Sequence, residues 1–271
     1  MSNAKYGIIA CIVAAQAAGS AASAQNNYTY LITADTYIDS SNPNTNYGAY
    51  GYDKIVDSDK PASSPSQCRT LFDLPSTLWS LPSSDILSAT VSFYTWNDNT
   101  GRYSNDVSLI PLTRAFGVGT GNGKTLSVAN GATWLTYDGT NSWTTPGADF
   151  DPATNSVPGV PGPVGSQGGT NFPDSNGRFF TFNIMPLLTN STTEDELQNY
   201  GAMLSIDIGN ALPATNVQYY AAFISADNTN YAASYLPSID LTVIPEPSSL
   251  LLVALGTTAT ACFLRKRPTQ R

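Results

Sequence analysis

Short hydrophobic runs alternate with clusters of Asn, Asp, Gly, Ser and Pro along residues 25–244. The runs are rich in β-branched and aromatic residues, as in Val91–Trp96 (VSFYTW), and many alternate between apolar and polar positions, which is typical of β-strands. We therefore predict strands at Tyr28–Thr33, Thr36–Asp39, Cys68–Asp73, Ile86–Tyr94, Val107–Thr113, Arg178–Asn183, Met203–Ile208, Gln218–Ile224 and Ser238–Val243. Short strands separated by turn signals predict an all-β fold, a single jelly-roll-like antiparallel β-sandwich over residues 25–244.

Two segments favour helix. A turn is predicted around Ile184–Thr189 and a helix at Thr193–Tyr200. Ser191 and Glu194 have the spacing of a capping box, in which two side chains satisfy the first free N–H groups of a helix. Gly201 can end this helix, because glycine readily adopts the left-handed conformation found after a helix.

Two other segments have neither pattern. Ser40–Gly51 (SSNPNTNYGAYG) is predicted to be a long loop rich in Asn, Gly and Tyr. Val157–Gly169 (VPGVPGPVGSQGG) has Gly at every third position from 159 to 168, but the repeat is too short for a collagen-like helix. We predict a flexible surface insertion there.

Residues 1–24 have the three-part design of a secretory signal peptide. Lys5 provides the positive charge, Gly7–Ala18 is apolar, and Ala22–Ala24 (ASA) is a cleavage site that leaves Gln25 first in the mature chain. An alternative is a lipoprotein signal ending at Cys11, although too few apolar residues precede it for an ordinary signal.

The C-terminal segment, residues 245–271, has a second three-part design. Pro245, Glu246 and Pro247 are followed by the apolar stretch Ser248–Leu264 and by a basic cluster, Arg265, Lys266 and Arg267. Seventeen helical residues span about 25 Å, somewhat less than the roughly 30 Å of a bilayer core. We predict a transmembrane helix with its basic end in the cytoplasm.

This arrangement resembles a PEP-CTERM sorting signal. The resemblance implies that an exosortase recognises the chain in a Gram-negative bacterium and cleaves it near Pro245–Pro247. The chain would then pass through the inner membrane, be held there transiently by its C-terminal helix, and reach the cell surface or an extracellular matrix. A plain C-terminal membrane anchor is the alternative.

The composition excludes several kinds of catalytic and binding site. The chain has no His, which excludes Ser-His-Asp and Cys-His nucleophile systems and imidazole metal sites. Between Gln25 and Pro247 there are seven Lys and Arg against twenty Asp and Glu, a net charge of −13, so binding to nucleic acid is not expected. Cys68 is the single cysteine of this region, and we predict a buried structural thiol.

Four pairs of motifs occur in a set order along the body of the chain. They are Ala34–Ile38 with Ser41–Gly48, Arg69–Pro75 (RTLFDLP) with Leu87–Val91, Ala132–Trp134 with Trp143–Asp151, and Ala222–Ala226 with Tyr235–Leu241. Together they resemble the DNRLRE-type domains, which are related to a carbohydrate-binding module family. The resemblance implies a jelly-roll β-sandwich that binds or supports polysaccharide and is not itself catalytic.

The candidate contact residues for a glycan are aromatic, because aromatic rings stack on the C–H faces of sugars. They are Tyr47, Tyr50, Tyr52, Trp134 and Trp143. For the two tryptophans a place in the core is the alternative, since indole rings bury a large area. The aspartates that could hold a structural Ca²⁺ are Asp57, Asp59, Asp149, Asp151 and Asp240.

The function predicted from these features is that of an exported, non-catalytic protein of the cell surface or extracellular matrix, associated with exopolysaccharide. One alternative is a dedicated carbohydrate-binding module with a specific glycan ligand. Another is a polysaccharide-acting enzyme, which would need a pair of carboxylates at the reacting bond. No motif in the sequence singles out such a pair.

Overall fold

The computed structural model describes residues 25–58, 66–98, 107–124, 126, 128–151, 156–163, 177–206 and 218–244. Contacts between Cα atoms divide the chain into a main unit, Tyr28–Leu241, and a unit formed by the two ends, Met1–Asn27 and Thr242–Arg271. In the described part of the second unit, the Thr242 hydroxyl donates to Asn27 Oδ1 at 3.0 Å.

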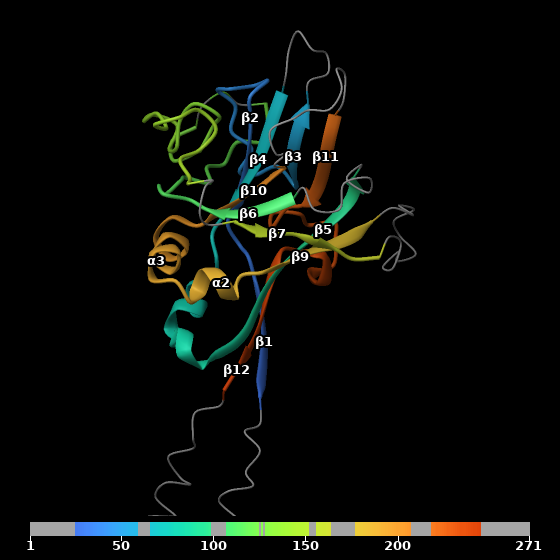
Figure 1. Cartoon of the computed structure of the whole chain (residues 1–271). Helices are drawn as coiled ribbons and strands as arrows, with labels where there is room; N and C mark the ends of the chain where they lie inside the picture. Colours follow the sequence, from blue (N-terminus) through green and yellow to red (C-terminus); the bar gives the residue numbers. More distant parts are fainter. Residues whose placement is uncertain are drawn as a thin grey trace, which may run out of the picture. The chain divides into compact units, whose positions relative to one another are not determined.

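Strands make up most of the regular structure (Figure 1). They are β1 (Asn26–Leu31), β2 (Asp35–Asp39), β3 (Tyr52–Ser58), β4 (Ser66–Phe72), β5 (Ile86–Asp98), β6 (Val107–Pro111), β7 (Val157–Pro158), β8 (Val160–Pro161), β9 (Arg178–Asn183), β10 (Ala202–Ile206), β11 (Gln218–Ile224) and β12 (Ser238–Val243). The helices are α2 (Met185–Leu188) and α3 (Ser191–Tyr200), and the 3₁₀ turns are η1 (Ser76–Ser80), η2 (Ser83–Asp85) and η4 (Ala233–Tyr235). The prediction of an all-β fold is confirmed.

Strand pairing is antiparallel wherever its register is defined, and the sheet branches at β4 and at β5. The strand order is β1-β12-β5-β11-β3-β4-β10-β6-β7, with β2 added to β4 and with β9 joining β5 to β8. Thr70 of β4 pairs with Leu204 of β10 on one edge and with Tyr37 of β2 on the other, while Cys68 pairs with Val56 of β3. With this pairing, the protein has the character of an antiparallel β-sandwich. Figure 1 shows β3, β4 and β11 side by side, with β6 and β7 running at a steep angle to them.

Phenylalanine dominates the core. Phe93 packs edge-to-face against Phe72 and Phe223, with ring centroids 5.0 and 5.7 Å apart, and Phe180 packs on Phe223 at 5.9 Å. All four side chains are buried. They come from β4, β5, β9 and β11, so one aromatic cluster joins strands that are far apart in sequence.

Several predicted strands match the structure, and others needed correction. The bounds of β9, β11 and β12 are those predicted. β5 continues four residues beyond the predicted end at Tyr94, so Trp96 lies inside a strand. β3 was not predicted at all, because the buried residue Asp53 interrupts the hydrophobic alternation.

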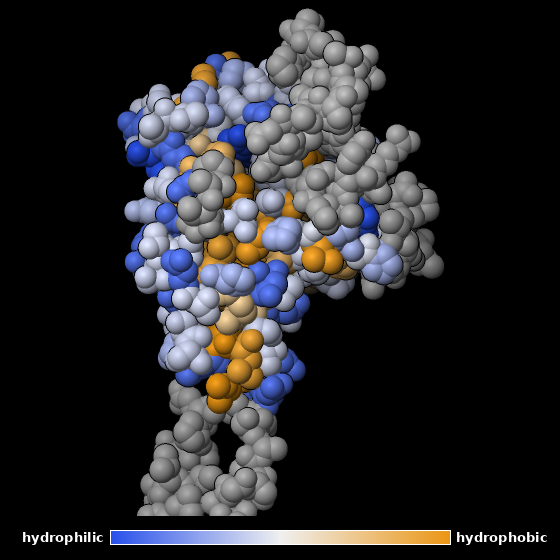
Figure 2. All heavy atoms as spheres, in the orientation of Figure 1, coloured by the Kyte–Doolittle hydropathy of each residue, from blue (hydrophilic) through white to orange (hydrophobic). Residues whose placement is uncertain are grey.

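The prediction of a flexible insertion at Val157–Gly169 was wrong for its first residues. Val157 is buried and pairs with Leu109 of β6, and Gly159 N donates to Val107 O at 2.7 Å. Val160 of β8 stays largely exposed. Figure 2 shows hydrophobic residues gathered over the region of β7 and β9 on this face. The later part of the insertion, residues 164–169, lies outside the described residues.

The two helices lie where the sequence predicts them, but the N-cap of α3 does not. Asn190 Oδ1 accepts hydrogen bonds from Thr192 N at 3.0 Å and Thr193 N at 3.4 Å, so Asn190 is the cap and Ser191 is the first helical residue. Gly201 ends the helix with a φ of 76°, as predicted.

This correction can be tested by mutation. We expect Asn190→Ala to lower the free energy of unfolding by about 1 kcal/mol, because two N–H groups of the first turn lose their acceptor. Ser191→Ala is the matched control, and its effect should lie within about 0.5 kcal/mol of zero. Urea unfolding of both variants measures the difference. A larger loss of unfolding free energy from Ser191→Ala than from Asn190→Ala would support the predicted capping box instead.

Candidate functional site

The outer face of β3 forms one side of a groove. Successive side chains of a strand point to opposite faces. Asp53 and Ile55 are accordingly buried, whereas Tyr52, Lys54 and Val56 are partly buried and line the groove. The groove thus uses the side chains that the core does not.

The neighbouring strand β11 continues the groove. Tyr220 lies opposite Val56, and Ala222 lies opposite Lys54 in the antiparallel register. Tyr220, Ala221 and Ala222 all line the groove. Because Ala222, opposite Lys54, is small, little side-chain volume stands above the sheet between the larger rings.

A β-bulge places Trp96 at the groove. Asn97 of β5 pairs with Ala222 and Thr95 pairs with Phe223, so Trp96 has no residue opposite it. Such an extra residue commonly re-aims a side chain. Its indole Nε1 is buried and finds no acceptor within the described part of the chain.

Three rings follow one another along the groove. The ring centroids of Tyr50 and Tyr52 are 6.3 Å apart, and those of Tyr52 and Trp96 are 5.8 Å apart. The groove has a volume of about 610 Å³, a size that suits a small-molecule or oligosaccharide ligand. Aromatic faces can stack on apolar ligand faces, and the Lys54 ammonium can donate hydrogen bonds.

Of the five predicted glycan-contact residues, the structure brings Tyr50 and Tyr52 into the groove. Tyr47 is in the interior instead, with 6% of its surface exposed and its ring stacked on Tyr37 at 3.9 Å between centroids. Burial, and next the negative charge of Asp39, raise the pKa of Tyr47 to about 12. Tyr47 is therefore a core residue, and the prediction that it contacts glycan is corrected.

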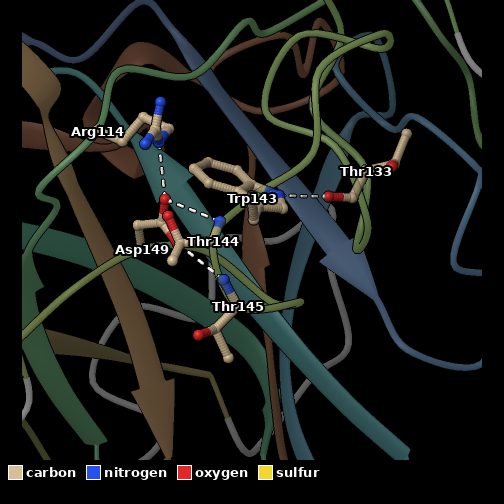
Figure 3. Close-up of polar contacts among 6 residues, drawn as sticks. All are labelled: Arg114, Thr133, Trp143, Thr144, Thr145 and Asp149. Carbon is tan, nitrogen blue, oxygen red and sulfur yellow. Dashed lines mark hydrogen bonds and ion pairs between the residues drawn. The ribbon is translucent and has the colours of Figure 1, made fainter.

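Trp143 is also a core residue. Only 4% of its surface is exposed, and its indole Nε1 donates to the Thr133 carbonyl at 2.9 Å (Figure 3). It packs in a hydrophobic cluster with Leu112 and Met203. Of the two alternatives that the sequence left open for Trp143, the structure selects the core.

Trp134 is partly buried and covered by a cation. The Arg69 guanidinium lies 5.3 Å from the Trp134 ring centroid and 4.8 Å from that of Phe150, and it donates to the Gly147 carbonyl. Burial lowers the pKa of Arg69 to about 10. One face of the Trp134 ring is thus occupied by Arg69.

A second depression, of about 450 Å³, lies beside this arginine and includes Arg114 and Asp149. Asp149 accepts from Arg114 Nε at 2.7 Å and from the N–H groups of Thr144 and Thr145 at 3.1 and 3.0 Å (Figure 3). Burial alone would raise the pKa of Asp149, but these donors outweigh it and hold the pKa below its usual value. In this depression Arg114 and Asp149 thus already bind each other, and Arg69 already donates to the Gly147 carbonyl, so we take the aromatic groove as the candidate site.

The calcium candidates do not come together. Asp149 is engaged by Arg114, Asp240 accepts from the Thr29 hydroxyl, and Asp57 and Asp151 lie in separate parts of the chain. Asp59 lies outside the described residues. Within the described residues, no group of three or more acidic, Cys or His side chains is placed to hold a metal ion.

Cys68 is buried in β4, against Tyr37 and Tyr47. Burial, and next the charge of Asp39, raise the pKa of its thiol well above the usual value. Because the thiolate is the reactive form, we expect a bulky thiol reagent to label Cys68 more than tenfold slower in the native chain than in urea. Peptide mapping after timed labelling measures this, and equal rates would contradict the burial.

The terminal signals lie outside the described residues. This applies to the predicted signal peptide at 1–24 and to the whole predicted sorting signal, including Pro245, Glu246, Pro247, Arg265, Lys266 and Arg267. In the ranges that the structure does describe, none of the helices is long and apolar enough to cross a membrane.

Comparison with known proteins adds no assignment. No protein-family model matches the chain, and no curated protein matches it. The resemblances to DNRLRE-type domains and to a PEP-CTERM signal therefore stay predictions from the sequence.

Proposed function

We propose that the chain is an exported, non-catalytic protein of the cell surface or extracellular matrix that contacts polysaccharide through the groove lined by Tyr50, Tyr52, Trp96 and Tyr220. The observation that carries the proposal is this row of aromatic side chains, which four separate positions in the sequence bring to one side of the sheet.

The chemistry of the lining supports binding. Tyr and Trp rings offer apolar faces with a polar edge, and Lys54 adds a hydrogen-bond donor. A glycosidase places two carboxylates on either side of the scissile bond, whereas the described lining is aromatic, aliphatic and basic. Such a lining suits stacking on a glycan more than its hydrolysis.

Export rests on the two ends of the sequence. The segment 1–24 has the pattern of a signal peptide, and 245–271 that of a sorting signal processed by an exosortase. The antiparallel β-sandwich character of the domain agrees with the jelly roll that the DNRLRE resemblance implies. We place the mature chain outside the inner membrane of a Gram-negative bacterium, at the surface or released into a polysaccharide matrix.

The groove also favours the closely related alternative, a dedicated carbohydrate-binding module. The two functions differ in specificity: a module binds one glycan with saturable affinity, whereas a matrix protein binds several related polymers weakly. Probing a glycan array with residues 25–244 tests both. Binding to one class of glycan identifies a module, binding to several polymers supports the matrix protein, and an array without signal would refute the proposal.

A further inference from the structure

Two buried carboxylates lie together on the inner side of the domain, away from the groove. Asp35 begins β2 and Asp53 lies in β3, and each has 1% of its surface exposed. Their carboxyl groups are within hydrogen-bonding reach of each other. Neither residue belongs to the aspartates that the sequence marked for calcium.

The two carboxylates differ in the number of hydrogen bonds that they accept. Asp35 accepts from the Ser225 hydroxyl at 2.9 Å and from Ala226 N at 2.8 Å. Neither carboxylate oxygen of Asp53 has a hydrogen-bond donor within the described part of the chain. Lys54, its neighbour in sequence, is on the other face of β3, where it lines the groove.

Two adjacent buried carboxylates lower the stability of the fold unless a positive charge lies between them. A buried carboxylate without a partner is strongly destabilised, and a second carboxylate beside it adds repulsion. Burial and the neighbouring Asp35 accordingly raise the pKa of Asp53 well above its usual value. The negative charge of the exposed Asp227 also raises the pKa of both groups.

The loop after β11 lies against Asp35 and is itself fixed by hydrogen bonds. Asp227 N donates to the Ser225 hydroxyl at 3.1 Å, and Asn228 Nδ2 donates to the Gly51 carbonyl at 2.6 Å, just before β3 begins. Ser225 and Asn228 are both buried. These bonds tie the loop to Asp35 on β2 and to Gly51, two residues before Asp53.

We propose that Asp35 and Asp53 form a calcium site that joins β2, β3 and the Ser225–Asn228 loop. Calcium prefers oxygen ligands in a flexible shell of six to eight, and the two carboxylates offer up to four. The Ser225 hydroxyl lies against Asp35, and main-chain carbonyl or water oxygens would complete the shell. The site is independent of the glycan groove.

Calcium titration of the full chain, freed of metal with EDTA, tests this proposal. We expect one calcium per chain with a Kd of about 10⁻⁴–10⁻³ M, the range of extracellular modules. At a free calcium concentration 100 times the Kd, the unfolding midpoint should rise by about 5–10 °C. Calorimetry and thermal unfolding measure the two effects.

Two substitutions give the comparison. Asp53→Asn should abolish both effects, whereas Asp240→Asn, a surface strand position, should leave them unchanged. If Asp53→Asn does not fold, the exposed Asp227→Asn replaces it, and at low ionic strength it should weaken calcium binding about two- to threefold through the loss of a nearby charge.

Several results would overturn the proposal. One is that the chain binds no calcium at concentrations up to 10 mM, which is about ten times the weakest Kd expected. Another is that Asp53→Asn binds calcium with wild-type affinity. A third is that the Kd for calcium is unchanged in Asp227→Asn. If the unfolding midpoint did not change with calcium but rose on acidification, the two carboxyl groups would share a proton instead. That result would equally exclude the metal site.

Discussion

Phe93→Ala is expected to lower the free energy of unfolding by about 3–5 kcal/mol. Phe93 is fully buried and contacts Phe72 and Phe223 at ring-centroid distances of 5.0 and 5.7 Å. Its removal leaves a cavity where three strands meet, and it ends both aromatic contacts. Urea unfolding followed by circular dichroism measures the loss.

The control for this substitution is Leu126→Ala. Leu126 is 71% exposed, so its truncation should change the free energy of unfolding by less than about 0.5 kcal/mol. A loss below about 1 kcal/mol for Phe93→Ala, or equal losses for the two variants, would mean that the phenylalanine cluster is not the core.

The second large effect concerns the groove. We expect Tyr52→Ala and Trp96→Ala each to weaken glycan binding about tenfold or more, which corresponds to about 1.4 kcal/mol of binding free energy. Each substitution removes one of the stacking faces that lie 5.8 Å apart in the groove. Binding is measured by calorimetry with a glycan identified on the array.

Tyr200→Ala provides the matched control for both variants. Tyr200 is an exposed tyrosine on α3, outside the groove lining, so its removal should leave glycan affinity unchanged. Each variant is first compared with the wild type by circular dichroism, which separates lost contacts from lost folding. Equal affinity for the Tyr52→Ala, Trp96→Ala and wild-type chains would show that the groove is not the binding site.

Much of the fold is predictable from the sequence because its strands alternate regularly. Arg178–Asn183 (RFFTFN) and Ser238–Val243 (SIDLTV) follow the two-residue period, and their strand bounds match the prediction. Tyr52–Ser58 (YDKIVDS) was missed because its inward residues are an aspartate and an isoleucine. An aspartate at a core position breaks the alternation of apolar and polar residues by which a strand is predicted.

The candidate site was less predictable than the fold. The sequence marked Tyr50 and Tyr52 as an aromatic display but could not show that Tyr47, in the same loop, stacks on Tyr37 in the interior. Trp96 was missed because its position depends on a register shift between β5 and β11. Such bulges depend on the pairing of distant strands, and the local sequence does not reveal them.

The central claim is that a glycan binds at the aromatic groove, and the indole N–H signals of the four tryptophans report on it directly in an NMR titration. With the glycan identified on the array, we predict a saturable shift of the Trp96 signal. The Trp143 signal should not move, because that indole is buried and bonded to Thr133. A titration in which the Trp134 signal shifts and the Trp96 signal stays fixed would place the ligand beside Arg69 and contradict the account.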